Sequence, residues 1–371
     1  MAEAISRAGG LALVASAGGR LEPDLEAAGG ELVKLPLQSK NPVTIVLNAF
    51  RLARIARARG VKLIHARSRA PAWSALIAAR LAGLAFVTTF HGIYNARTPL
   101  KRFYNSIMAR GDAVIANSEY TRAHILAHYH VAPERIVVIP RGVDLDLFDP
   151  GLVKPAAAAA LRAEWGVAPD DARCVLIAPA RLTRWKGQLV LIEAAELIEA
   201  RRPGALKLIL AGDPQGRLGY VDEIKTAISS AGLQQSVAMV GHLGHMPPAF
   251  AASDIAVFPV IEPEAFGRGA VEAQAMGVAV IASNLGGYAE TIVDGETGLL
   301  VPPGAPEDLA SAIERLMDAG AEARLAMGAR GRGRARALYS KTALQSATLA
   351  VYQSLLSDAN AGESAKIGSG G

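Results

Sequence analysis

Short apolar runs alternate with longer segments in which apolar residues recur every three or four positions. The short runs predict buried strands, and the 3.6-residue spacing predicts helices. In the first 140 residues we expect strands at 11–15, 31–35, 61–65, 86–90, 113–116 and 136–139. We expect helices at 41–59, 71–81, 99–110 and 118–129. This alternation is typical of parallel sheets covered by helices, so the chain is expected to be an α/β protein.

The alternation pauses at 141–170 and then starts again. The pause holds Gly142, Pro150 and a Pro-Ala-Ala-Ala-Ala-Ala run at 155–160, a composition that favours a linker. We therefore expect one domain at 1–150 and another at 151–335. Strands of the second domain are expected at 174–178, 206–211, 237–240, 255–258, 278–282 and 298–301. Its helices are expected near 187–201, 220–232, 247–252, 268–276, 287–293 and 306–317.

The chain of 371 residues is long enough for two domains with sizeable cores. Beyond the second domain, the segment 336–357 is expected to contain a helix, at 341–356, that packs back toward the N-terminal domain. The Gly- and Ser-rich end at 358–371 is expected to be a disordered tail.

Basic residues are concentrated in the first half of the chain. Residues 1–150 hold 19 Lys and Arg against 11 Asp and Glu, and the segment 40–110 holds 13 basic residues and no acid. Arg51, Arg54 and Arg57 recur at helical spacing among apolar residues, which predicts a basic amphipathic helix for an anionic membrane surface. A solvated basic face is the alternative. Nucleic acid is not an expected partner, because no zinc spacing, aromatic sheet motif or helix-turn-helix pattern accompanies the charge.

The cysteine content favours a cytoplasmic location. Cys174 is the only cysteine, so no intramolecular disulfide can form. It opens the apolar run at 174–178, which predicts a small buried strand residue rather than a reactive thiol. No apolar run approaches the roughly 20 residues that span a bilayer.

The strongest chemical signal follows the strand expected at 255–258. Glu264 and Glu272 lie eight residues apart, separated by a Phe266-Gly267 turn and the start of a helix. Backbone N–H groups at a helix start can bind anions. A carboxylate inside the helix can accept hydrogen bonds from two vicinal hydroxyls, as ribose offers. The alternative is that both glutamates are solvated acids.

A second signal follows the strand expected at 174–178, where Arg181 and Lys186 precede a helix. Together these two cations could neutralise a diphosphate and stabilise it as a leaving group. Either one alone is ordinarily a solvated charge. Ligands of open α/β sheets bind beyond the carboxyl ends of the strands, which favours a functional role here.

Two more strand ends carry candidate residues. Gly286 and Gly287 follow the strand expected at 278–282 and lead to Glu290, and glycine lets a backbone approach a ligand closely. His91 follows the strand expected at 86–90. A tight turn and a structural histidine are the respective alternatives.

Taken in this order, the blocks resemble the retaining group-1 glycosyltransferases of the GT-B fold. The resemblance runs from about residue 1 to 355 and implies two Rossmann-like domains facing across a cleft. It also implies that a hexose-type sugar passes from a nucleotide-sugar donor to a glycan or lipid-linked acceptor with retention of configuration. Within that family it leans toward synthesis of bacterial lipopolysaccharide core or a related cell-surface polysaccharide, at the inner face of the cytoplasmic membrane. The resemblance rests on His91-Gly92, Asn117-Ser118, Gly142-Val143-Asp144, Arg181 with Lys186, Glu264 with Glu272, and Gly286-Gly287 with Glu290.

The resemblance also implies a role for each candidate residue. Glu272 would hold the nucleotide ribose, Glu264 the hydroxyls of the donor sugar, and Arg181 with Lys186 the diphosphate. His91 would approach the donor sugar from the acceptor domain. The backbone N–H groups around Phe266, Gly267, Gly286 and Gly287 would contact sugar or phosphate, and Glu290 would also belong to the donor-binding residues.

Neither a metal nor another cofactor is implied by the resemblance. Asp144 and Asp146 have the spacing of an acid pair that could hold a metal, but they fall in the expected inter-domain loop. The implied reaction is same-face attack on the sugar through an oxocarbenium-like state, with no carboxylate nucleophile assigned.

The chain departs from the family pattern at its start. The family begins with a strand and a glycine-rich loop, whereas residues 1–10 resemble the helix that follows them. We therefore expect that the first strand, central in the N-terminal sheet, is missing. Arg67 lies where a second histidine is common, and Arg268 where an uncharged residue is common.

Two alternatives to the transferase stay open. One is a membrane-associated nucleotide-sugar-binding protein without turnover, and the other is a GT-B nucleotide-sugar epimerase. A dinucleotide dehydrogenase is disfavoured, because no Gly-x-Gly-x-x-Gly motif follows an early strand. The nucleotide base (UDP, GDP or ADP), the sugar and the acceptor remain open as well.

Overall fold

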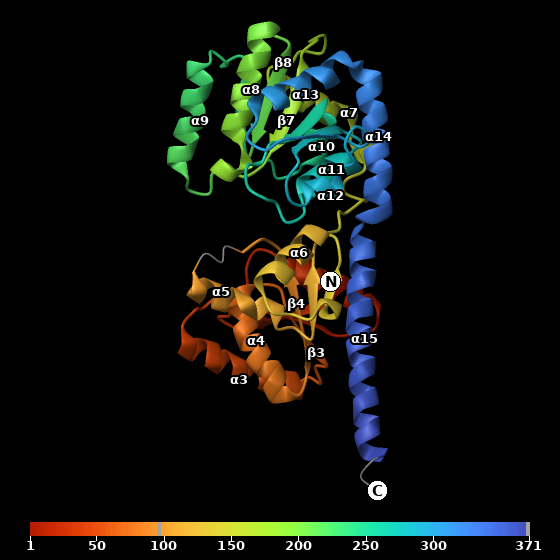
Figure 1. Ribbon diagram of the computed structural model, residues 1–371. Helices are drawn as coiled ribbons and strands as arrows, with labels where there is room; N and C mark the ends of the chain where they lie inside the picture. Colours follow the sequence, from red (N-terminus) through yellow and green to blue (C-terminus); the bar gives the residue numbers. More distant parts are fainter. Residues whose placement is uncertain (95–97, 369–371) are drawn as a thin grey trace. The chain divides into compact units, whose positions relative to one another are not determined.

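The computed structural model describes residues 1–94 and 98–368, with side chains up to residue 357 (Figure 1). It divides into two compact units. Unit 1 is Met1–Pro140 with the segment from Thr342 onward, and unit 2 is Arg141–Lys341. Both units consist of parallel strands that alternate with helices, so the predicted α/β class is confirmed. Arg97, one of the 13 basic residues between 40 and 110, lies outside the described residues.

Unit 1 contains two separate parallel sheets. The smaller sheet joins β1 (Ala12–Ser16) to β2 (Gly30–Lys34). The larger sheet has the order β3-β4-β5-β6. Among the described strands, β1 pairs with β2 alone and β3 with β4 alone, so each has one side without a strand partner. The strands of the larger sheet are β3 (Leu63–Ala66), β4 (Ala85–Phe90), β5 (Ala113–Ala116) and β6 (Ile136–Val138).

The helices of unit 1 begin and end at residues that suit those positions. Asn41 caps the longest connecting helix by accepting a hydrogen bond from the Val43 N–H at 2.9 Å, and Ser118 caps a later one through the Thr121 N–H. Gly83 ends the helix before β4 in the left-handed conformation. The helices are α1 (Ala2–Arg7), α2 (Glu22–Ala27), α3 (Pro42–Ala58), α4 (Arg69–Ala82), α5 (Pro99–Ser106) and α6 (Glu119–His128), with single turns η1 (Ile107–Ala109) and η2 (Pro133–Arg135).

The four-stranded sheet of unit 1 has a core on each face. Phe86 and Phe90 of β4 pack with α4, η1 and α6 on one face. Val87, between them in the strand, points to the opposite face, because side chains alternate along a strand. There it packs near Leu344 and Val351 of α15 (Lys341–Gly368). The end of the chain therefore completes the core of unit 1.

Unit 2 has one six-stranded parallel sheet in the order β12-β11-β10-β7-β8-β9. Its strands are β7 (Cys174–Pro179), β8 (Leu206–Ala211), β9 (Val237–Gly241), β10 (Ile255–Phe258), β11 (Ala279–Ser283) and β12 (Leu299–Val301). The chain reverses direction across the sheet at β7, because β8 joins one side of it and β10 the other. In doubly wound sheets such a switch point opens a crevice at the carboxyl ends of the strands.

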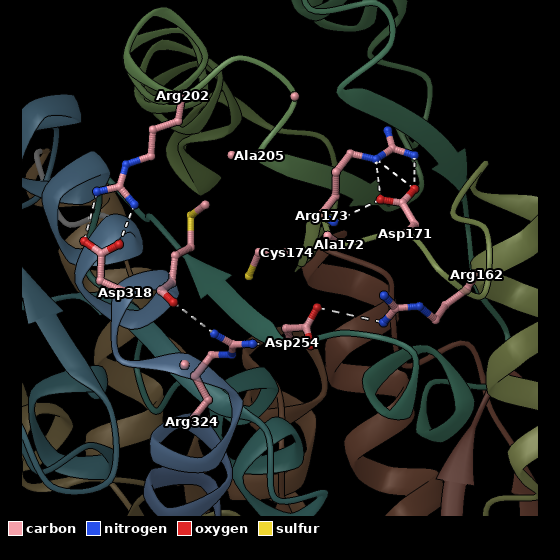
Figure 2. Close-up of a pocket in the computed structure, with 13 residues that line it drawn as sticks. Arg162, Asp171, Ala172, Arg173, Cys174, Arg202, Ala205, Asp254, Asp318 and Arg324 are labelled. Atoms are coloured by element: carbon pink, nitrogen blue, oxygen red, sulfur yellow. Dashed lines mark hydrogen bonds and ion pairs between the residues drawn. The ribbon is translucent and has the colours of Figure 1, made fainter.

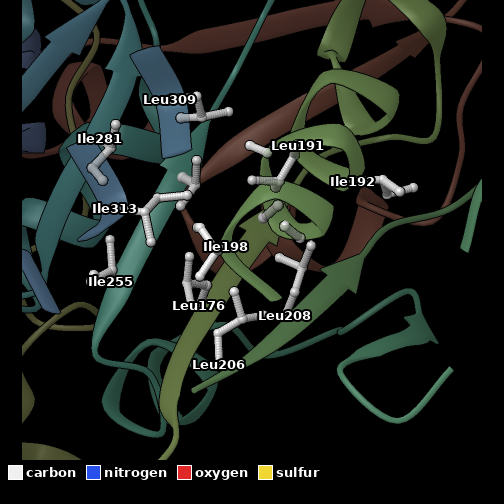
Figure 3. Close-up of a cluster of buried hydrophobic side chains, with 14 of the residues drawn as sticks. Leu176, Leu191, Ile192, Ile198, Leu206, Leu208, Ile255, Ile281, Leu309 and Ile313 are labelled. Atoms are coloured by element: carbon white, nitrogen blue, oxygen red, sulfur yellow. The ribbon is translucent and has the colours of Figure 1, made fainter. Parts of the chain in front are cut away.

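Helices cover both faces of the unit 2 sheet, so its strands are apolar apart from a few buried polar side chains such as Lys207 of β8. Leu176 points into the cluster that Leu191, Ile198, Leu309 and neighbouring side chains form with α8 (Gln188–Arg201), α9 (Leu218–Ser230) and α13 (Pro306–Asp318) (Figure 3). Its neighbours in β7 point to the other face. That face is covered by α7 (Pro155–Glu164), α10 (Pro247–Ala251), α11 (Arg268–Ala275), α12 (Tyr288–Thr291) and α14 (Gly320–Leu338).

The unit boundaries differ from the predicted ranges for identifiable reasons. Unit 2 begins at Arg141 rather than 151, because the Val143 N–H donates to the Tyr339 carbonyl and the Lys341 N–H donates to the Val143 carbonyl. The alanine run at 155–160, expected in a linker, is the start of α7. A turn at 150–152 precedes it as η3 (Pro150–Leu152), and η4 (Arg184–Lys186) follows β7.

The C-terminal helix is longer than expected. The helix predicted at 341–356 is α15, which continues to Gly368. Part of the tail predicted at 358–371 therefore lies on this helix, and 369–371 lie outside the described residues.

Candidate functional site

The carboxyl ends of β7 and β10, which flank the switch point of unit 2, carry oppositely charged side chains in contact. Lys186 lies in η4 after β7, and Glu264 lies in the loop after β10. The Lys186 Nζ donates a hydrogen bond to the Glu264 Oε2 and forms an ion pair with it. The two side chains are only 13% and 25% exposed. Residues 78 positions apart in the sequence are thus brought together where a sheet of this kind binds ligands.

Trp185 and a glycine fix the position of Lys186. The Lys186 ammonium lies 4.1 Å from the centre of the Trp185 ring, a cation–π contact. The Trp185 carbonyl accepts a hydrogen bond from the Ile261 N–H at 2.9 Å, which ties the η4 turn to the loop after β10. Gly187 follows with φ +74°, and a Cβ on it would overlap the Pro259 carbonyl oxygen. Glycine at this position therefore allows the two loops to touch.

Arg181 lies at the same edge but is more exposed than Lys186. Its guanidinium lies 5.8 Å from the centre of the Trp185 ring and donates a long hydrogen bond, 3.4 Å, to the Gln215 side chain. Gln215 belongs to the loop after β8, the next strand in the sheet, and has a positive φ of 50°. The two cations predicted after β7 are therefore both at the carboxyl edge, one held by an acid and the other by an amide.

Glu272 lies one turn inside α11, with its side chain 14% exposed. Its Oε1 lies 3.0 Å from Arg268 Nε, an i,i+4 ion pair on the helix surface. Burial raises the pKa of Glu272 above the usual glutamate range, and the charges of Arg268 and Arg141 oppose that rise. An oriented, partly desolvated carboxylate of this kind can accept hydrogen bonds from hydroxyl groups.

Tyr288 lies near both predicted glutamates, Glu264 and Glu272. Its ring is buried, stacks on Phe258 at 5.7 Å between ring centres, and lies under Gly267, where a Cβ would collide with it. Burial raises the pKa of Tyr288 well above its usual value, and the charges of Glu264 and Glu272 raise it further. Both carboxylates therefore lie close enough to act on one phenol. Sequence reasoning did not select Tyr288, because its partners are distant in the sequence.

The glycine pair after β11 makes contact with the backbone around Glu264. The Gly287 N–H donates to the Glu264 carbonyl at 2.7 Å, and Gly286 forms a parallel bridge with Glu264. A Cβ on Gly286 or Gly287 would overlap the backbone of Glu264 or Phe266. The close approach predicted for these glycines is thus made to a neighbouring loop, and the Gly287 N–H is engaged within the protein.

Phe266 and Glu290, two more predicted residues, are held from α14 and the turn that follows it. Phe266 packs edge-on against Tyr339, with ring centres 5.4 Å apart. The Glu290 carbonyl accepts hydrogen bonds from Arg334 at 2.9 Å and from the Tyr339 hydroxyl at 3.3 Å. These contacts fix the positions of Phe266 and of the Glu290 backbone, which lie beside Glu264 and Gly287.

His91, the remaining predicted residue, belongs to unit 1. It follows β4, and its Nε2 accepts a hydrogen bond from the Arg67 Nε at 3.2 Å. Arg67 follows β3, the strand next to β4. The two residues thus lie at the carboxyl edge of the unit 1 sheet, the position that corresponds to the site of unit 2.

Asp144, part of the Gly142-Val143-Asp144 block, has a structural partner. The Lys341 Nζ donates to Asp144 at 2.7 Å, and this contact lowers the pKa of Asp144. In the described part of the chain no group of three or more His, Cys, Asp or Glu side chains is placed to hold a metal ion. Among the described residues, no helix is long and apolar enough to cross a membrane.

Family models match both units. The model for glycosyl transferases group 1 matches residues 163–334, and the model for glycosyltransferase family 4 matches residues 1–147. The first range contains every predicted site residue of unit 2, and the second contains His91.

Solved structures resemble the whole chain. A glycosyltransferase from Rickettsia africae ESF-5 is 33% identical with a TM-score of 0.88, and the match covers 96% of this chain and 93% of that one. Anabaena HepE in complex with UDP and glucose is 25% identical with a TM-score of 0.81, over 95% of this chain and 94% of that one.

Curated relatives match over a smaller share of their length. D-inositol 3-phosphate glycosyltransferase from Arthrobacter sp. strain FB24 is 32% identical over 277 residues, which are 69% of this chain and 62% of the relative. The chain spans 48% and 50% of two further relatives of that name. The two family models and the full-length match to the Rickettsia enzyme show that this chain belongs to the group 1 glycosyltransferases, a generally metal-independent family with the GT-B fold of two Rossmann-like domains.

Proposed function

We propose that this protein transfers a sugar from a nucleotide-sugar donor, bound at the carboxyl edge of the unit 2 sheet, to an acceptor. The observation that carries this proposal is the Lys186–Glu264 pair, which places a cation and an acid in contact across the switch point, with Glu272 on the adjoining helix. A nucleotide sugar needs both kinds of group, because its diphosphate is anionic and its two sugars present hydroxyls.

The cations would act on the leaving group. As the glycosidic bond breaks, negative charge grows on the diphosphate, and Lys186 with Arg181 would stabilise that charge. Lys186 has three N–H donors, so its bond to Glu264 leaves two for phosphate oxygens. The free N–H groups in the first turn of α11, around Gly267, would add partial positive charge.

The acids would position the two sugars of the donor. Glu264 would accept hydrogen bonds from the transferred sugar, and Glu272 from the vicinal hydroxyls of the ribose. Gly286, Gly287, Phe266 and Glu290 would shape the floor beneath them, as their contacts suggest.

We propose UDP as the nucleotide, because HepE, 25% identical over nearly the whole chain, is described in complex with UDP and glucose. Transfer of a hexose with retention of configuration, as the resemblance implies, is part of this proposal. A role in lipopolysaccharide or cell-surface polysaccharide synthesis stays a prediction. The curated relatives are instead named for D-inositol 3-phosphate.

We propose that unit 1 is the acceptor side and docks on an anionic membrane from the cytoplasm. Val43, Val46, Leu47 and Phe50 lie at i, i+3, i+4 and i+7 of α3, and all four are exposed, Phe50 by 58%. Exposed apolar residues flanked by the α3 arginines fit an anionic bilayer surface. Flotation with phosphatidylglycerol vesicles tests this: the Phe50→Ser variant is expected to bind several-fold more weakly, and unchanged binding would rule out this face.

A second candidate function is donor binding without turnover. The open sides of β1 and β3 favour it, since they leave the smaller sheet of unit 1 with two strands. An epimerase is the third candidate. Product analysis separates the three, because only a transferase needs an acceptor and only an epimerase changes the sugar of the donor.

The experiment is a thermal melt with UDP, GDP or ADP. A ligand at about 100 times its dissociation constant adds roughly 2.7 kcal/mol to the free energy of unfolding, or several degrees in melting temperature. We expect UDP to shift the melt of the wild type and not that of Glu272→Ala. The control is Glu196→Ala, an exposed glutamate inside α8.

Lys186→Ala is expected to lower turnover more than donor binding, because the charge that it stabilises grows in the transition state. If none of the nucleotides shifts the wild-type melt, or if the Glu272→Ala and Glu196→Ala variants respond alike, the proposed donor site is wrong.

A further inference from the structure

A cavity of about 610 Å³ lies in unit 1, at the carboxyl ends of β3 and β4. Arg67 and Arg69 border it after β3, and His91 and Tyr94 after β4. Its polar lining also includes Lys40, Ser68, Lys101, Tyr104 and Asn105. We call this space the unit 1 cavity. It is large enough for a sugar-sized ligand with a charged substituent.

The charge of the unit 1 cavity is one-sided. Of the described residues that line it, four are permanent cations, namely Lys40, Arg67, Arg69 and Lys101, and none is Asp or Glu. Among the described residues, none of these four has a carboxylate within ion-pair distance. Four like charges around one space repel each other, so an anion that enters would relieve that repulsion.

The arginine-rich cavity of unit 2 shows the opposite arrangement (Figure 2). It too has four arginines, but acids neutralise them: Arg173 pairs with Asp171, Arg202 with Asp318, and Arg162 and Arg324 both approach Asp254 within 4 Å. That cluster lies at the amino end of β7, next to Cys174. Its charges are satisfied inside the protein, whereas those of the unit 1 cavity are not.

The two arginines of the unit 1 cavity are held in place by neighbouring side chains. The Arg69 guanidinium lies 4.4 Å from the centre of the Tyr94 ring and 6.0 Å from that of Tyr104, and it donates to the Asn105 Oδ1 at 2.8 Å. Arg67 uses its Nε for His91. Its two terminal nitrogens remain available for another acceptor, and a guanidinium fork of this kind matches phosphate oxygens.

We propose that the unit 1 cavity binds a phosphate group carried by the acceptor, and that Arg67 and Lys101 are its main ligands. This inference rests on the proposed transferase function, since it names the class of molecule that receives the sugar. A phosphate matches the cavity better than a neutral glycan, because it neutralises two of the four cations and uses their N–H donors.

The test measures binding of D-inositol 3-phosphate, inositol and inorganic phosphate to the whole protein by calorimetry. Saturating UDP is present throughout, so that phosphate cannot bind at Arg181 and Lys186. The variants are Arg67→Gln and Lys101→Gln. Their matched control is Lys62→Gln, an exposed lysine at the amino end of β3, which loses the same charge far along that strand from Arg67.

We expect the phosphate ester to bind at least tenfold more tightly than inositol. Arg67→Gln and Lys101→Gln are each expected to weaken it five- to tenfold, and Lys62→Gln less than twofold. Equal binding of ester and inositol, or equal affinities in the cavity and control variants, would overturn the proposal. The UDP melt separates this failure from failure of the donor site, because it reports on unit 2 in every variant.

A lipid-borne phosphate is distinguished with vesicles of phosphatidylcholine that contain phosphatidic acid. If Arg67→Gln weakens vesicle binding fivefold or more while Lys62→Gln does not, and soluble esters bind weakly, the phosphate belongs to a lipid. If Arg67→Gln weakens binding of the soluble ester but not binding of the vesicles, the acceptor is a free phosphate ester. If Arg67→Gln weakens binding of neither the soluble ester nor the vesicles, the unit 1 cavity has no phosphate ligand.

Discussion

The carboxyl edges of the two units differ in the signs of their charges. In unit 2, cations and acids meet in contact, as in Lys186 with Glu264 and Arg268 with Glu272. In unit 1 the described residues that line the cavity at the corresponding edge include four cations and no acid. Mixed charge suits a donor that combines anionic phosphates with sugar hydroxyls. Charge of one sign suits a ligand whose main feature is an anion.

The sheets behind these edges differ as well. Unit 2 has six paired strands with helices on both faces, whereas unit 1 divides its strands into sheets of two and four. A two-stranded sheet is marginal by itself. Rigid support therefore lies under the proposed donor site, and the more easily opened structure lies in unit 1. Each of the following predictions tests one side of this contrast.

The largest effect is expected at Gly187. Alanine there would collide with the Pro259 carbonyl and would keep a φ of +74° that side chains disfavour. We expect Gly187→Ala to destabilise unit 2 by about 3 kcal/mol or more and to abolish UDP binding. Gly216→Ala is the control, since Gly216 has φ +79° but open space around it, and should cost only about 1 kcal/mol.

Cys174 provides the measurement for this pair. Burial raises the pKa of its thiol to about 12, so the folded protein should react slowly with a disulfide reagent. Labelling against urea concentration then reports the opening of unit 2. If Cys174 labelling has the same urea midpoint in Gly187→Ala and Gly216→Ala, the loops around Gly187 can move apart without a loss of free energy of unfolding.

The next effect concerns the smaller sheet of unit 1. We expect the free energy of opening that allows amide hydrogen exchange to be at least about 2 kcal/mol lower in β1 and β2 than in β7 and β8. The physical reason is that β7 has a strand on each side and β1 has one. Exchange followed by mass spectrometry measures this directly. Equal protection of the two regions would remove the contrast between the units.

The sequence predicted most strands within one or two residues, because parallel strands buried on both faces are continuous apolar runs. It also predicted that Arg181, Lys186, Glu264 and Glu272 lie at one sheet edge. The composition of residues 155–160 predicted a linker. This segment forms α7, since alanine has the highest helix propensity and proline suits the first turn.

Other features had no local signal. Tyr288 lies within electrostatic reach of two glutamates that are 16 and 24 positions away in the sequence. Gly286 and Gly287 face protein backbone rather than an open space. The ion pair of Lys186 and Glu264 depends on the strand order, because β7 and β10 are adjacent only through the switch in topology. Residue patterns predict strands more easily than they predict which strands are neighbours.

A smaller effect is expected from acid on unit 1. His65 is held by the Tyr352 hydroxyl at 2.5 Å and the Thr89 hydroxyl at 2.7 Å. Burial, with the nearby charges of Arg67 and His91, lowers the pKa of His65 to about 3. In the unfolded state the pKa of His65 is near 6.5. As the pH falls below that value, the unfolded protein therefore binds a proton at His65 that the folded protein does not bind.

Stability is thus lost progressively below about pH 6.5, and lowering the pH from 6.5 to 5.5 should cost unit 1 about 1 kcal/mol. Hydrogen exchange of β3 and β4 at the two pH values measures it. The His65→Gln variant is expected to lose this dependence. If the variant keeps the same slope, another group is responsible.

The smallest effect tests the mixed charge of unit 2 at Glu272. The ribose is proposed to bind the ionised carboxylate, so donor affinity is full above the pKa of Glu272 and falls as the pH drops below it. Burial raises that pKa, and Arg268 lowers it in part. Arg268→Gln should therefore move the loss of UDP affinity to higher pH, giving a difference of a few fold at mildly acidic pH and none at pH 8. Arg315→Gln, an exposed arginine of α13, is the control and should behave as the wild type. If UDP affinity has the same pH profile in Arg268→Gln and Arg315→Gln, Glu272 is not the titrating ligand. The difference in charge between the donor site of unit 2 and the unit 1 cavity would then rest on Glu264 alone.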